Sequence, residues 1–152
     1  MPSRRASMRA TANRRRDPMA PMTAFYAALL AFLFLALSMN VIRHRYRART
    51  ALGDGGDPRL ARAIRAQANF AEYVPLTLVL MLGLELTGGP AWLLHLAGVF
   101  LLAGRLAHGA AFTCFDQAPK LRVAGMVLTF SAIAGAAIGA LAAAAARYLI
   151  PQ

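Results

Sequence analysis

The chain has 152 residues, of which 59% are hydrophobic and 15% are charged, and its mean hydropathy is +0.49. Soluble domains are usually about 45–50% apolar and charged at about a quarter of their residues, so this composition excludes an ordinary water-soluble fold. The net charge is +11 and comes almost entirely from arginine. Because the arginines flank apolar runs of membrane length, anionic lipid headgroups account for this charge, and we expect no nucleic-acid partner.

The first segment, residues 1–20, is rich in arginine and small polar residues, and we expect it to be disordered. Its arginines conflict with the positive-inside rule, because the loop that follows the first apolar run is also rich in arginine and lies on the other side of the membrane. The conflict disappears if translation begins at Met19 or Met22, a hypothesis that mass spectrometry of the native N-terminus would test. Residues 21–150 are expected to form one membrane domain.

Four apolar runs follow the tail in chain order. The first expected span covers residues 21–42, long enough at about 1.5 Å per residue to cross the ~30 Å hydrocarbon core. A Gly- and Asp-rich break leads to the second span at 59–86, which a TGGP stop signal ends. The third span is expected at 91–112 and the fourth at 122–149. The sequence therefore predicts an all-α membrane protein, a four-transmembrane-helix bundle.

The basic residues also predict the orientation of the loops. The first loop and its flanks are rich in arginine, and Lys120 and Arg122 flank the third loop, whereas the second loop, residues 87–90, has no basic residue. Since cytoplasmic loops carry an excess of Lys and Arg, we expect loops one and three to be cytoplasmic.

A polar stripe enters the membrane on the second helix. Arg62, Arg65, Asn69 and Glu72 recur at steps of three or four and so share one helical face. One interpretation is an internal ion pair, of Glu72 with Arg65 or with Arg105, that locks the bundle. The other is a pocket for a small charged ligand, in which guanidinium groups bind carboxylates in a bidentate manner. Spacing alone does not separate these interpretations.

Other candidates for chemistry are few. Arg122 either flanks the membrane or stabilises the thiolate of a thiol ligand, since a nearby positive charge lowers a thiol's pKa. Cys114 is the single cysteine, so no intramolecular disulfide forms, and its reactivity stays open. We expect no metal site, because the histidines lack metal-ligand spacing: His44, His95 and His108.

Two motifs resemble a known family. RAQANFAEYVP at residues 65–75 looks like the second-helix signature of the membrane-associated proteins in eicosanoid and glutathione metabolism. GRLAH at 104–108, followed by LRVAGM at 121–126, is similar to bacterial members. The resemblance covers residues 22–150. It implies a four-helix protomer, a homotrimer in a bacterial inner membrane, and glutathione bound as cofactor between neighbouring subunits at the cytoplasmic side.

Residue by residue, the resemblance also implies a site. Arg122 matches the arginine that activates the thiol, and Gln67 matches a position that reaches across the subunit interface. The other matches are to glutathione-binding positions: Arg45, Arg65, Asn69, Glu72 and Tyr73. The chain departs from conjugating members of the family where they often have tyrosines on the third helix, since it has His108 and Phe112 there.

Two functions follow as expectations. The first is a glutathione transferase or peroxidase that acts on lipophilic small molecules reaching the site from the lipid. The second is a non-enzymatic membrane scaffold or accessory subunit, in which the polar cluster is structural. Because of the departure on the third helix, ligand binding is better supported than catalysis, and whether the chain is an enzyme is left open.

Overall fold

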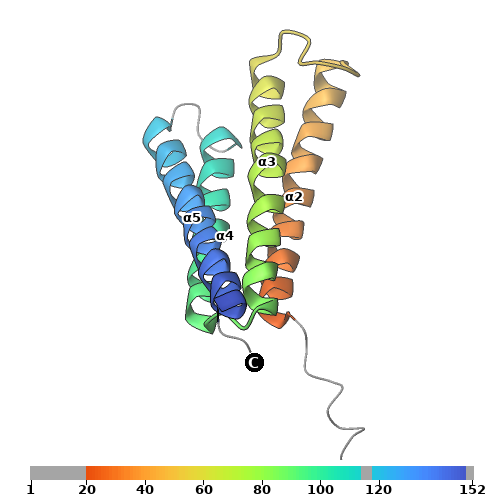
Figure 1. The fold of residues 1–152 in the computed structure, drawn as a ribbon. Coiled ribbons are helices and arrows are strands. Elements are labelled where there is room, and N and C mark those ends of the chain that lie inside the picture. Colours follow the sequence, from red (N-terminus) through yellow and green to blue (C-terminus); the bar gives the residue numbers. More distant parts are fainter. Residues whose placement is uncertain (1–19, 114–117, 150–152) are drawn as a thin grey trace, which may run out of the picture.

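A computed structural model of the chain describes residues 20–113 and 118–149. It contains four helices, α2 (Pro21–Ala48), α3 (Pro58–Leu86), α4 (Ala91–Thr113) and α5 (Pro119–Leu149) (Figure 1). Each is long and apolar enough to cross a membrane. The predicted all-α architecture with four spans is confirmed, whereas the expected N-terminal tail and Cys114 lie outside the described residues.

Two helices extend beyond the spans expected from hydropathy. Helix α2 continues to Ala48, past the expected end at residue 42, and α5 begins at Pro119 rather than at 122. Both extensions carry basic residues. Since about 20 residues cross the hydrocarbon core, the 28 residues of α2 leave its arginine-rich end to project into the headgroup region.

Helix α3 begins with a local cap. The Asp57 side chain accepts hydrogen bonds from the backbone N–H groups of Arg59 (2.8 Å) and Leu60 (3.3 Å), and Pro58 occupies the first helical position. These bonds hold the pKa of the Asp57 carboxyl below its ordinary value of 3.8, and the bond from the Arg59 N–H has the largest effect. The break after the first span therefore ends in a well-defined helix start.

Helix α2 is capped by a distant residue. Ala20 has no side chain that caps the helix. Instead, the Glu85 carboxylate at the end of α3 accepts hydrogen bonds from the backbone N–H groups of Met22 (2.9 Å) and Thr23 (2.8 Å). A carboxylate at a helix N-terminus satisfies free N–H groups and complements the helix dipole. Glu85 therefore joins the start of α2 to the end of α3.

The helices form two antiparallel hairpins, α2–α3 and α4–α5, that lie side by side (Figure 1). Among the described residues α2 contacts α3 and α4 but not α5. The connection between α2 and α3 and the facing ends of α4 and α5 lie at one end of the bundle, uppermost in Figure 1. One buried cluster joins all four helices: Leu30, Leu37, Ala66, Phe70, Val74, Leu101 and Ala132.

Helices α4 and α5 pack backbone to backbone at two glycines. A Cβ atom on Gly104 would lie 2.8 Å from the carbonyl oxygen of Gly125, and one on Gly125 would lie 2.8 Å from the carbonyl oxygen of Gly104. In lipid, small residues allow helices to pack backbone to backbone. This contact sets the separation of α4 and α5 just below the polar end of the bundle, where the candidate site lies.

Candidate functional site

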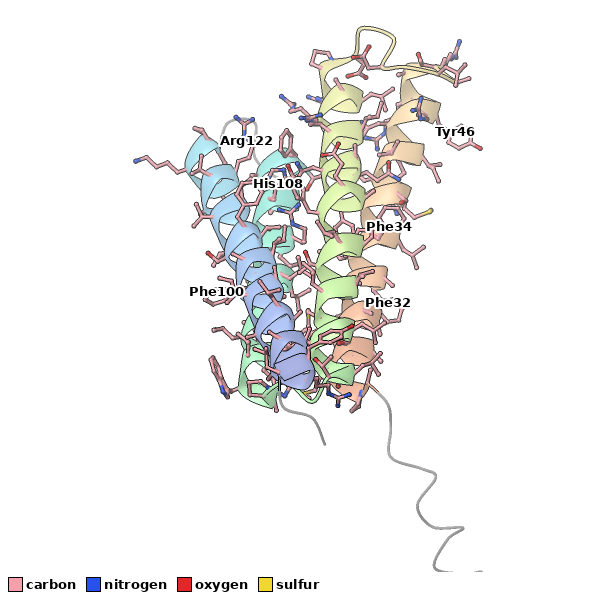
Figure 2. All side chains as sticks on the ribbon, in the orientation of Figure 1. Phe32, Phe34, Tyr46, Phe100, His108 and Arg122 are labelled. Atoms are coloured by element: carbon pink, nitrogen blue, oxygen red, sulfur yellow. The ribbon has the colours of Figure 1, made fainter. Side chains whose placement is uncertain are left out.

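A cavity of about 650 Å³ lies between α3, α4 and α5. Its polar side chains come from three helices: Arg65, Asn69 and Tyr73 from α3, His108 from α4, and Arg122 from α5. Its apolar side chains are Phe112, Val123, Met126, Val127 and Phe130. Figure 2 labels His108 and Arg122 at the end of the bundle that carries the α2–α3 connection. The cavity therefore combines positive charge with an apolar wall.

Arg105 lies beneath the cavity and is 2% exposed. Its Nη1 donates to Asn69 Oδ1 (2.7 Å), and its Nη2 and Nε donate to Thr129 Oγ1 (2.6 and 3.1 Å). The guanidinium also lies 5.7 Å from the centre of the Tyr73 ring. A buried charge needs such partners. Here neutral oxygens and an aromatic ring supply them, and together they link α3, α4 and α5.

The contact with Arg105 determines how Asn69 faces the cavity. An arginine side chain has only donors, so the atom of Asn69 that faces it must be the amide oxygen. No hydrogen bond from the amide NH₂ group of Asn69 is found among residues 20–113 and 118–149, so this group can donate to a ligand. Thr129, by contrast, donates to the carbonyl oxygen of Gly125 (2.8 Å) while it accepts from Arg105, so its hydroxyl is fully used.

His108, Phe112 and Arg122 contact one another where the end of α4 faces the start of α5. The rings of His108 and Phe112 have centroids 5.1 Å apart, and the Arg122 guanidinium carbon lies 5.3 Å from the centre of the Phe112 ring. A guanidinium over an aromatic ring is held by a cation–π interaction. Phe112 therefore contacts both the Arg122 guanidinium and the imidazole of His108.

His108 is 5% exposed, and within residues 20–113 and 118–149 neither of its ring nitrogens makes a well-formed hydrogen bond, although the backbone of Arg122 lies near the ring. Buried polar atoms nearly always have one. Sequence reasoning treated His108 only as a departure from the family pattern and did not place it in the site. The signal was its position in GRLAH, three residues after Arg105, which places both residues on one face of α4.

Four of the predicted site residues come together in the cavity, namely Arg65, Asn69, Tyr73 and Arg122. Gln67 does not, because it lies on the face of α3 toward α2, where its Nε2 lies 3.2 Å from the Ser38 hydroxyl oxygen and donates to it. The same periodicity that groups Arg65 with Asn69 and Tyr73 turns Gln67 away from them.

Glu72 and Arg45 also lie outside this cavity. Glu72 is exposed on α3, and no ion pair joins it to Arg65 or Arg105 in residues 20–113 and 118–149. Arg45 lines a second cavity of about 490 Å³ at the end of α2 and donates to the carbonyl oxygens of Ala51 (3.1 Å) and Gly53 (3.0 Å). Within one chain, the internal Arg–Glu pair that the sequence left open is not formed.

No group of histidine, cysteine, aspartate and glutamate side chains that could hold a metal ion occurs in the part of the chain that the structure describes. The cavity lining has no carboxylate either, whereas Arg65 and Arg122 both contribute to it. The arrangement is thus suited to an anionic ligand, which arginines bind through charge-assisted hydrogen bonds.

The fold and the cavity together define a four-span α-helical membrane protein with a polar site at one end of the bundle. The sequence profile of the MAPEG family matches residues 23–142, and the chain belongs to this family. It is also 41% identical over 112 residues to the inner membrane protein YecN of Escherichia coli K12 and of Escherichia coli O6:H1 strain CFT073. Each match covers 74% of this chain and 84% of the relative.

Proposed function

We propose that this chain binds glutathione in the cavity between α3, α4 and α5. It joins the glutathione sulfur to lipophilic electrophiles, or uses two glutathione molecules to reduce a peroxide to an alcohol and water with glutathione disulfide as the oxidised product. The observation that supports the proposal is the convergence of the signature residues Arg65, Asn69 and Tyr73 with Arg122, which comes from a different helix and is distant in sequence. Glutathione carries two carboxylates and one thiol, which suits a cavity with several donors and no carboxylate of its own.

Each residue of the cavity has its own role in the proposed binding of glutathione. Arg65 provides a planar set of donors for a carboxylate, and the free NH₂ group of Asn69 donates to a carbonyl or carboxylate oxygen. Arg122 provides the positive charge that favours a thiolate over a thiol. The nucleophile is then the sulfur of glutathione, while the protein supplies binding, orientation and charge.

The apolar wall suits the second substrate. Phe130, Val123 and Val127 line the cavity, and each has at least half of its side chain exposed on α5. In a membrane this face meets acyl chains, so a lipophilic molecule reaches the sulfur without crossing water. In a conjugation the sulfur lone pair forms the new sulfur–carbon bond, and the electrophile gains a proton or loses its leaving group.

We propose further that the working unit is a homotrimer. Glu72 is exposed on a membrane-spanning helix, where an ionisable side chain facing lipid is costly by about 2.5–3.5 kcal/mol. A neighbouring copy that covers this face of α3 would shelter Glu72. It would also bring Arg45 or Gln67, which lie outside the cavity of their own chain, toward the cavity of the next one.

The proposed location is the inner membrane of a bacterium. The support is the similarity to YecN, which is described as an inner membrane protein. The arginine-rich ends of α2 and α3 and the facing ends of α4 and α5 lie at one end of the bundle, so this end would be cytoplasmic by the positive-inside rule. The cavity would then open on the side where glutathione is made.

A titration tests the proposal. Detergent-purified protein is titrated with glutathione, and thiolate formation is followed by its ultraviolet absorbance. Wild type and Lys120→Ala, which changes an exposed basic residue outside the cavity, are expected to bind glutathione and form thiolate. Arg122→Ala is expected to bind with little thiolate. Absence of binding by wild type would refute the proposal.

A second candidate function is the non-enzymatic scaffold or accessory subunit. The observation that favours it is the buried cluster of Arg105, Asn69 and Thr129, whose hydrogen bonds are made within the chain and need no ligand. On this alternative the protein would not bind glutathione, and Asn69→Ala would disturb assembly of the protein without altering any thiol chemistry.

A further inference from the structure

We infer that His108 donates a hydrogen bond to the sulfur of the bound thiol, so that the thiolate is held jointly by Arg122 and His108. This inference rests on the proposed function and assigns a further positioning residue to the same cavity. The starting point is the two buried ring nitrogens of His108, neither of which makes a well-formed hydrogen bond in the part of the chain that the structure describes.

The burial of His108 is the first step. With 5% exposure, its imidazole has lost most contact with solvent, yet it contributes to the cavity lining. Leaving a buried donor without a partner is unfavourable. Such a cost persists in a fold when the group has a partner in another state of the protein, and here the cavity is where such a partner would lie.

The charges around His108 define the form in which it acts. Arg65 on α3 and Arg122 on α5 line the cavity together with His108, and Arg105 lies three residues before it on α4. Tyr73 is a further titratable group that lines the cavity, and no carboxylate does. A fourth positive charge among three guanidinium groups is unfavourable. His108 therefore acts as a neutral imidazole, with one N–H donor and one acceptor nitrogen.

The position of His108 favours the sulfur over the carboxylates as its partner. Its ring packs on one ring, that of Phe112, which also holds the Arg122 guanidinium. A group drawn to Arg122 thus comes close to His108, whereas Arg65 reaches the cavity from α3 and takes no part in this contact through Phe112. On ionisation the thiol proton leaves to water, because the cationic surroundings oppose its transfer to His108. One proton is released for each thiolate formed.

Binding of glutathione as a function of pH tests this assignment. The variants are His108→Leu, which removes the donor, and His108→Gln, which keeps one. His95→Leu on the same helix is the control, since His95 lies outside the cavity and contacts Tyr26 near the other end of α4. For His108→Leu we expect the pH midpoint of thiolate formation to rise by about one unit, a tenfold loss of thiolate below the midpoint. His108→Gln should restore most of the thiolate.

Several outcomes separate this inference from the proposed function. If wild type does not bind glutathione, the proposed function fails. If His108→Leu binds glutathione and keeps the wild-type midpoint, only the role of His108 fails. A merely structural role would weaken binding without moving the midpoint, and that result would also overturn the inference.

A second measurement uses wild type alone, and it tests the hydrogen bond from His108 to the sulfur even if His108→Leu does not fold. In wild type labelled with ¹⁵N-histidine, glutathione is expected to shift the protonated ring nitrogen of His108, while the ring stays neutral. S-methylglutathione, which occupies the cavity but has no ionisable sulfur, should leave that resonance near its unliganded position. Equal shifts with both ligands, or protonation of the ring, would contradict the assignment.

Discussion

The guanidinium of Arg105 on α4 donates a 2.7 Å hydrogen bond to the amide oxygen of Asn69 on α3. This bond connects the signature of the second helix with GRLAH of the third. It orients Asn69 so that the amide NH₂ group is available to the cavity. Neutral oxygens, those of Asn69 and Thr129, accept the hydrogen bonds of the Arg105 guanidinium. The candidate site is therefore assembled on a buried network that exists without a ligand.

Replacing Arg105 tests this network. Arg105→Met keeps the apolar stem but leaves the Asn69 oxygen without its donor, which costs about 1–3 kcal/mol for a buried group. We expect a lower Tm in detergent and weaker glutathione binding. Thr129→Val should also destabilise the protein, because the Arg105 guanidinium then loses an acceptor.

The double variant Arg105→Met with Thr129→Val provides the control. Because both partners of one hydrogen bond are then removed, its loss of stability should be smaller than the sum of the two single losses, with a coupling of about 0.5–3 kcal/mol. Strictly additive losses of stability would show that the contact contributes little.

The close approach of α4 and α5 leads to the second prediction. Gly125→Ala places a methyl group 2.8 Å from the carbonyl oxygen of Gly104, so the helices must separate, at a cost of about 1–3 kcal/mol. Gly135→Ala is the matched control on the same helix, since its nearest neighbour, Leu93, would lie 3.9 Å away. There alanine is expected to be neutral or stabilising. Thermal unfolding in detergent compares the two, and equal Tm values would refute the steric argument.

The third prediction concerns the cap supplied by Glu85. Glu85→Ala leaves the backbone N–H groups of Met22 and Thr23 without their acceptor, which should cost about 1 kcal/mol. Glu85→Gln keeps one acceptor oxygen and should lie between Ala and wild type. Hydrogen exchange of the Met22 and Thr23 amides measures the effect locally. Unchanged exchange in Glu85→Ala would mean that water replaces the carboxylate at no cost.

Asp57 gives a prediction about pH. The pKa of its carboxyl is lowered in the folded state, mainly by the hydrogen bond from the Arg59 N–H. The charged carboxylate therefore stabilises the fold at pH values above 3.8, the pKa of the unfolded state. The contribution is lost as the pH falls below 3.8 through the folded pKa. Hydrogen exchange in the first turn of α3 should therefore accelerate in this range. Asn at position 57 caps the helix but does not titrate. In Asp57→Asn, hydrogen exchange in the first turn of α3 should therefore change with pH only as the intrinsic exchange rate does.

Hydropathy predicted the four spans because few backbone structures are stable in lipid. An apolar run long enough to cross the membrane must satisfy its own backbone hydrogen bonds, which a helix does. Residue periodicity likewise placed Arg65 with Asn69, since residues four apart share a face of any α-helix. Ends were less predictable: α2 continues to Ala48 because its arginines are compatible with helix outside the membrane.

The sequence by itself determined that this is a membrane bundle, that its basic loops lie at one end, and that a polar stripe follows one face of the second helix. Only the tertiary structure decided that Arg105 pairs with Asn69 and Thr129 rather than with Glu72, and that His108 borders the cavity with no well-formed hydrogen bond to the described residues. The physical reason is that these contacts depend on how closely and at what rotation the helices pack. Gly104 and Gly125 set that approach, and periodicity within a single helix carries no information about it.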